Sequence, residues 1–175
     1  MDKLYPEGAL VVRPVDGNRW SFEYPRLSWE MLETFHDAIE LWRAGHVTEA
    51  EAEFVRLVTA FPEFIDARHH LALLLSESGR GEEAYKVWQR AVKVGLSCLP
   101  DTFETGKDQL PWAMVENRPF LRACHGLGLE YLERGRVEQA LDVFEDMLAM
   151  NPGDNQGIRA LAIDCYFRLG DPEGV

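Results

Sequence analysis

The chain has 175 residues, of which 46% are hydrophobic and 27% are charged, and its formal net charge at pH 7 is -12. Apolar residues are frequent enough for a folded core. The acidic balance argues against a nucleic-acid binder, which needs clustered Lys and Arg, and against binding to an anionic membrane surface. No apolar segment approaches the roughly 20 residues of a membrane helix, and three scattered cysteines are typical of a reducing compartment, so we expect a cytoplasmic protein.

Residues 1–27 differ from the rest of the chain. Trp20, Phe22 and Tyr24 alternate with polar residues, which is the period of a strand, and Asp16-Gly17 precedes them. Asp-Gly is a typical hairpin turn, because a type I′ turn needs positive φ at both central residues. We therefore expect an N-terminal extension with a β-hairpin. Since an isolated hairpin is only marginally stable, it should pack on the first helix that follows.

From residue 28 onward the period of the apolar residues becomes that of helices. Ser28 is expected to cap the first helix, and Thr48, with Glu51 three residues later, predicts a capping box for the second. Asn117 predicts an N-cap before Pro119 in the first turn of a later helix. The sequence thus predicts helices near 28–44, 48–62, 64–77, 82–94, 118–134, 137–150 and 155–169.

One pattern of small and bulky residues recurs in these helices. The step from Gly45 to Gly79 is 34 residues, and the step from Ala50 to Ala84 is the same. The next step is 56 residues, which is this period lengthened by a 22-residue insertion at 97–118. A fixed period of this size indicates stacked supersecondary units of two helices.

Residues 121–154 resemble a tetratricopeptide repeat (TPR), a family whose pattern is matched at Leu127, Gly128, Tyr131, Ala140, Phe144 and Pro152. Residues 31–64 and 65–98 match the same pattern, and 155–175 match it in part. The resemblance implies an all-α fold over residues 28–175, a right-handed α-α superhelix of three repeats and a half repeat. It also implies a binding function without catalysis.

In TPR proteins the first helix of each pair lines a concave groove, where a peptide or helical segment of a partner protein docks. Carried over position by position, the resemblance implies a groove lined by Leu32, Phe35, Ile39, Trp42, Arg43, Asp66, His69, Leu73, Ser76, Glu77, Arg122, His125, Leu129, Leu132 and Glu133. The alternative is that the hairpin already covers Leu32, Phe35 and Trp42. Trp112 of the insertion is either part of a lip on this groove or part of a connector packed on its neighbours.

One TPR subclass grips the C-terminal carboxylate of chaperones with Lys and Asn at fixed groove positions. The corresponding positions here hold Phe35, Ile39, His70, Arg122 and Gly126, of which only Arg122 could serve. We therefore expect no chaperone-tail clamp.

No pattern of catalytic or metal-binding residues stands out. His69 and His70 are adjacent and so point about 100° apart on a helix, unlike an i, i+4 pair of metal ligands. No cofactor is expected, and an enzyme or a metal protein is the least favoured reading.

The fourth repeat ends after its first helix, and Asp171-Pro172 is typical of a helix start. We expect either a fragment of a longer protein or self-association through this end. The first function expected is an adaptor for a protein partner. The alternative is a structural scaffold that forms a homo-oligomer through the C-terminal half repeat.

Overall fold

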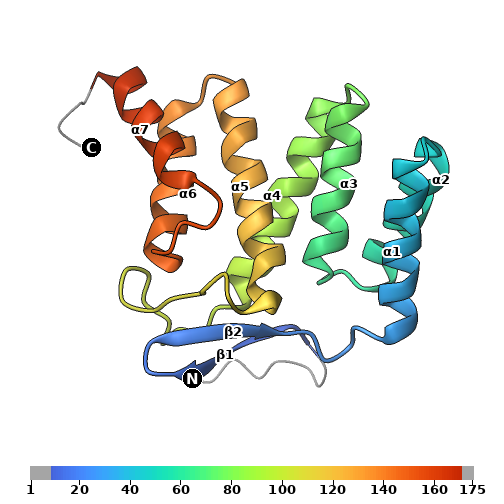
Figure 1. Cartoon of the computed structure of the whole chain (residues 1–175), viewed down its shortest axis with the longest axis horizontal. Coiled ribbons are helices and arrows are strands. Elements are labelled where there is room, and N and C mark those ends of the chain that lie inside the picture. Colours follow the sequence, from blue (N-terminus) through green and yellow to red (C-terminus); the bar gives the residue numbers. More distant parts are fainter. Residues whose placement is uncertain (1–8, 171–175) are drawn as a thin grey trace.

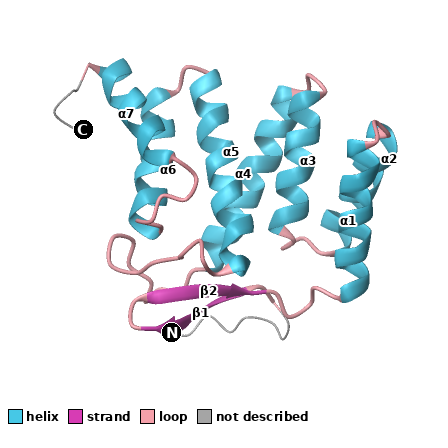
Figure 2. Cartoon of the chain, viewed as in Figure 1, coloured by secondary structure: helices cyan, strands magenta, loops and turns pink. Residues whose placement is uncertain are grey.

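Seven α-helices follow one another along the molecule as antiparallel neighbours in the computed structural model, which describes residues 9–170 (Figures 1 and 2). The helices are α1 Trp29–Arg43, α2 Val47–Ala60, α3 Ile65–Glu77, α4 Gly81–Cys98, α5 Arg118–Glu133, α6 Val137–Met150 and α7 Ile158–Leu169. α1 packs on α2, α3 on α4 and α5 on α6, and α7 packs on α6. The predicted all-α array with an N-terminal hairpin is confirmed. The helix start predicted at Asp171-Pro172 lies outside the described residues.

The helix ends agree with the sequence in part. Ser28 caps α1, because its hydroxyl accepts a hydrogen bond from the amide of Met31 at 3.2 Å. The capping box predicted at Thr48 is wrong, since α2 begins at Val47 and no side chain caps it. Asn117 is the residue before α5, as predicted, but its side chain does not cap the helix. Instead, the side chain of Asn117 forms hydrogen bonds with the backbone of the N-terminal hairpin.

Small residues let the paired helices approach closely, as the repeat pattern predicts. A Cβ atom on Gly128 of α5 would lie 2.3 Å from the ring of Phe144 of α6, and one on Gly126 would lie 2.5 Å from the indole of Trp88 of α4. Ala140 of α6, another small residue of the repeat pattern, is completely buried. The core therefore depends on an aromatic side chain of the second helix that fills the space left by a small residue on the first.

The N-terminal hairpin consists of β1 Val11–Asp16 and β2 Arg19–Glu23, which pair antiparallel around Gly17. It lies across the base of α5 and the insertion (Figure 1), so the predicted docking on the first helix is wrong. The ring of Phe22 is 5.3 Å from that of Phe120 at the start of α5. The amide of Trp20 donates a hydrogen bond to the carbonyl of Gln109 at 2.8 Å.

The insertion joins this hairpin to the end of the array. Leu110 is fully buried, and its amide donates a hydrogen bond to the carbonyl of Met150, the last residue of α6, at 2.7 Å. A short 3-10 helix, η1 Val115–Asn117, then leads into α5. No helix within residues 9–170 has the length and apolar character needed to cross a lipid bilayer.

Candidate protein-binding groove

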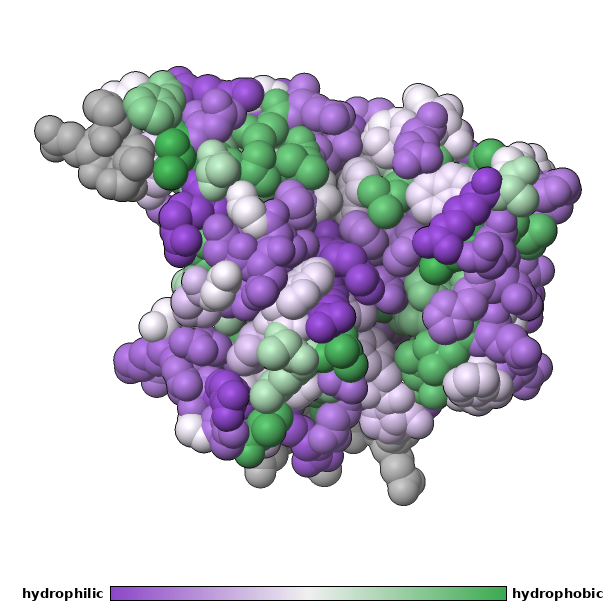
Figure 3. Space-filling model, in the orientation of Figure 1, coloured by the Kyte–Doolittle hydropathy of each residue, from purple (hydrophilic) through white to green (hydrophobic). Residues whose placement is uncertain are grey.

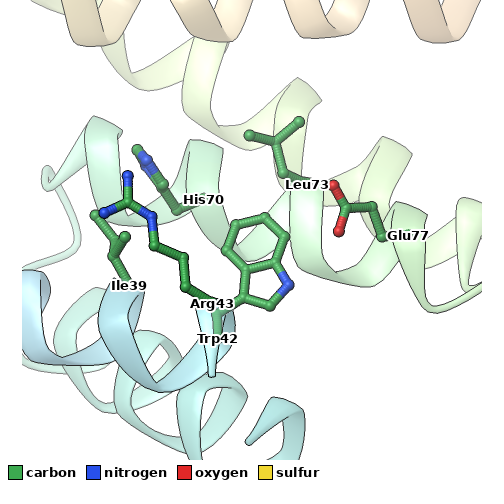
Figure 4. Close-up of a pocket in the computed structure, with 6 residues that line it drawn as sticks. All are labelled: Ile39, Trp42, Arg43, His70, Leu73 and Glu77. Carbon is green, nitrogen blue, oxygen red and sulfur yellow. The ribbon is translucent and has the colours of Figure 1, made fainter. Parts of the chain in front are cut away.

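The first helices of the first two pairs form an open pocket of about 360 Å³. Its lining, drawn in Figure 4, consists of Ile39, Trp42 and Arg43 of α1 and His70, Leu73 and Glu77 of α3. The indole of Trp42 reaches across the pocket toward Leu73 and Glu77, while the guanidinium of Arg43 lies on the side of Ile39 and His70. The pocket therefore has an apolar floor and charged groups of both signs at its rim. A hydrophobic patch at the right of Figure 3, over α1 and α3, has hydrophilic residues around it.

Phe35 supports this pocket from the core. Its side chain is 5% exposed, and its ring lies 5.1 Å from Phe64 and 5.0 Å from His70. The structure thus places Phe35 behind the groove surface, where a ligand does not reach it. The hairpin does not cover Trp42, which lines the open pocket.

A charge network links the second repeat to the third. One guanidinium nitrogen of Arg122, Nη2, lies 2.8 Å from both carboxylate oxygens of Asp66. The Nδ1–H of His70 donates to the backbone carbonyl of Asp66 at 2.9 Å and lies 3.4 Å from its carboxylate. Burial alone would raise the pKa of Asp66, but His70 and the charge of Arg122 outweigh burial and hold that pKa below its usual range. Arg122 is therefore already engaged within the protein.

His69 faces the core and not the groove. Its side chain is 7% exposed, and its Nδ1 accepts a hydrogen bond from the indole N–H of Trp88 at 3.2 Å. Burial lowers the pKa of His69 to about 3, so the ring is neutral at pH 7.

The groove positions predicted on α5 differ in exposure. His125 is half-buried, with its Nδ1 3.4 Å from Nε2 of Gln156, whereas Leu129 and Glu133 are exposed.

Trp112 lies at the base of the array. Its backbone amide donates to the side chain of Asn151 at 3.1 Å, and the guanidinium of Arg118 lies 5.2 Å from its ring centroid. Trp112 does not line the pocket between α1 and α3. These contacts join the insertion to the start of α5 and to the residue that follows α6.

His70 is the pocket residue that the predicted groove set lacks. It lies three residues before Leu73 and seven before Glu77, so the helical period alone places all three on one face. Within residues 9–170, no group of three or more His, Cys, Asp or Glu side chains is placed to hold a metal ion.

Two family models described as tetratricopeptide repeat match the chain, one over residues 37–97 and the other over residues 131–174. The chain belongs to the TPR family. The hairpin and residues 98–118 of the insertion lie outside both matches. No curated protein sequence matches the chain.

Solved structures, two of them described as TPR domains, share the fold. The first TPR domain of Spaghetti (RPAP3), solved with the HSP90 peptide SRMEEVD, is 15% identical over 80% of this chain and 93% of that one, with a TM-score of 0.59. The Sgt2 TPR domain from Aspergillus fumigatus is 12% identical over 85% and 84%, with a TM-score of 0.60. MamA from Desulfovibrio magneticus RS-1 is 14% identical over 86% and 71%, with a TM-score of 0.56.

Proposed function

We propose that this protein is a non-catalytic adaptor that binds a peptide or helical segment of another protein along α1, α3 and α5. The observation that carries the proposal is the open pocket in which Trp42, Ile39 and Leu73 form an apolar floor. Pockets of this size that combine apolar side chains with a few polar groups are typical ligand sites, and three of the six lining residues here are apolar. A partly exposed Trp is a frequent hot spot of protein interfaces. The three cysteines are buried and form no disulfide with one another, which fits the cytoplasmic location that we propose.

The pocket favours a ligand with one large apolar anchor residue. Arg43 and Glu77 at the rim would hold polar groups on either side of the anchor, while Leu129 and Glu133 of α5 would contact the rest of the segment. The RPAP3 domain shows a TPR array of this fold with a peptide bound.

We do not propose an acidic chaperone tail as the ligand here. Of the five positions that correspond to the chaperone clamp, Phe35 and Gly126 are buried, and the cation of Arg122 is paired with Asp66. A carboxylate ligand would therefore have to displace an existing ion pair.

Random peptides displayed on phage provide the test. Peptides selected on the full chain should carry an aromatic or large aliphatic residue, and Trp42→Ala should weaken their binding by at least about tenfold, as for an interface hot spot. Trp29→Ala is the matched control, because Trp29 is also on α1 but is 79% exposed and does not line the pocket. Selected peptides that bind the Trp42→Ala variant as well as the wild type would refute the proposed groove.

Self-assembly through α7 is the second candidate, because α7 exposes Phe167 and Leu169, which are 64% and 40% accessible. Sedimentation at increasing protein concentration would detect it. We expect any homo-oligomer of this kind to become a monomer in Phe167→Glu, and a wild type that stays monomeric would exclude it.

A further inference from the structure

A second groove lies between α4 and α6, away from the pocket of α1 and α3. It has a volume of about 910 Å³, and no residue lines both hollows. Its floor comes from α5, with Leu127 and Tyr131, and its walls come from α4 and α6, each of which packs on α5. Leu96 on the α4 wall is 49% exposed. The groove therefore has one long wall from α4, an apolar floor from α5, and Val143 on the α6 side.

The α4 wall carries a row of positive charges. Lys86, Arg90 and Lys93 all line the groove, all are exposed, and their spacing of i, i+4 and i+7 places them on one face of the helix. None of them forms an ion pair within residues 9–170, whereas Arg80 and Arg134 on neighbouring turns are both paired with glutamates. In a chain with a net charge of -12, this row is a basic edge, in which Lys86 also lies near the carboxylates of Glu82 and Glu83 one turn earlier.

The α6 side has the opposite charge. Asp142, Glu145 and Asp146 are exposed on that helix. The pKa of Asp146 is raised, first by burial and then by the charges of Asp142 and Glu145, so these carboxylates repel one another. These carboxylates are on the helix that contributes Val143 to the groove, so they favour a ligand whose acidic residues lie on the α4 side.

We propose that this groove binds an amphipathic helix of another protein that has one acidic edge. Its apolar face would pack on Leu96, Tyr131 and Val143. Its acidic residues, spaced i, i+4 and i+7, would face the basic row of α4. The ligand helix and α4 both rise by about 1.5 Å per residue, so acidic and basic residues with the same spacing stay opposite one another over two turns. Helix-in-groove docking supplies the apolar affinity, and charge complementarity sets the orientation.

The probe is a designed helical peptide of about 16 residues with Leu on one face and Glu along one edge, labelled with fluorescein. Its binding to the full chain is followed by fluorescence anisotropy. We expect Lys93→Glu and Leu96→Asp each to weaken binding by at least about tenfold. Lys107→Glu, with the same charge change in the exposed insertion, should alter it by less than about twofold. Trp42→Ala should leave it unchanged, which separates this groove from the proposed peptide pocket.

Four results would overturn the proposal. The first is no binding of the acidic peptide at about 0.5 mM. The second is equal binding of a matched peptide with Lys in place of Glu. The third is an equal loss in Lys93→Glu and Lys107→Glu, which would indicate attraction to net charge only. The fourth is a wild-type dimer that Lys93→Glu converts to a monomer, because a second copy would then occupy the groove.

Discussion

The indole N–H of Trp88 donates a hydrogen bond to Nδ1 of His69 at 3.2 Å. This bond joins the two helices of the second repeat inside the core, where Trp88 is 4% and His69 7% exposed. An accepting Nδ1 carries no proton, so the fold holds this imidazole in its neutral form. Trp88 is at a position where the repeat requires a bulky residue, and His69 accepts the hydrogen bond of its indole N–H.

Acid should therefore destabilise the protein through His69. The pKa of His69 falls from 6.5 to about 3 in the folded protein, so the unfolded chain binds the proton more readily. The stabilisation from the neutral ring is complete above about pH 6.5 and is lost as the pH falls toward about 3. Urea unfolding at about pH 7.5 and about pH 5 should show a loss of about 2 kcal/mol from this residue.

His69→Gln is the control for this loss. Its amide oxygen can still accept from Trp88, but it does not titrate. The variant should lose less stability than the wild type between the two pH values. Equal losses would show that other groups cause the acid sensitivity.

Gly126 and Gly128 should not tolerate alanine. A Cβ at Gly126 would lie 2.5 Å from Nε1 of Trp88, and one at Gly128 would lie 2.3 Å from the ring of Phe144. Overpacking of this kind costs about 1–3 kcal/mol, which urea denaturation would measure. Gly81→Ala is the matched control in the first turn of α4, where the nearest atom would be 4.0 Å away. That change should be neutral or stabilising by less than about 1 kcal/mol, and a similar loss at all three sites would contradict the packing argument.

The same contacts explain why the array could be predicted from the sequence. A helix pair packs only if small and bulky residues meet at fixed positions. Residues such as Ala84, Trp88 and Gly128 therefore recur at the same positions of each repeat. The pocket followed from the same register, since five of its six residues lie at positions assigned to the groove. The repeat positions also assigned Phe35 to the groove surface. That assignment is wrong, because the period of a helix does not reveal how deeply each residue of one face is buried.

The position of the hairpin on the helical array could not be predicted from the repeat pattern. Phe22 and Asn117 are hydrogen-bonded although 95 positions separate them, and no local pattern encodes a contact between two segments outside the repeats. Asn117 looked like a helix cap because caps and buried amide linkers use the same residue type. The hairpin was placed on the first helix only because that helix is next in the chain.

The ion pair of Asp66 and Arg122 should couple the second and third repeats. Its side chains are 17% and 34% exposed, so it is partly shielded from water. A double-mutant cycle with Asp66→Asn and Arg122→Gln should give a coupling of about 1 kcal/mol in urea unfolding. The exposed pair Arg13 and Glu23 is the control and should show no measurable coupling. Equal coupling energies in the two pairs would mean that burial does not strengthen the ion pair of Asp66 and Arg122.

Asn117→Ala should release the hairpin from the array. The side-chain oxygen of Asn117 accepts from the amide of Phe22 at 3.0 Å, and its Nδ2 donates to the carbonyls of Trp20 and Pro111 at 3.0 and 3.2 Å. Asn117 is completely buried, so alanine leaves the amide of Phe22 and the carbonyl of Trp20 without this partner, whereas the carbonyl of Pro111 still accepts from the amide of Met114. The expected cost is about 1–3 kcal/mol for the unpaired groups.

Hydrogen exchange distinguishes this release from a general loss of stability. In Asn117→Ala the amide of Phe22 should exchange at least about tenfold faster, because it loses the side-chain oxygen that accepts its hydrogen bond, while the amides of α7 keep their rates. Asn155→Ala, at an exposed position in the turn before α7, should change neither. Protection lost equally across β2 and α7 would mean that the hairpin and the helices unfold as one unit, and that Asn117 stabilises the whole chain.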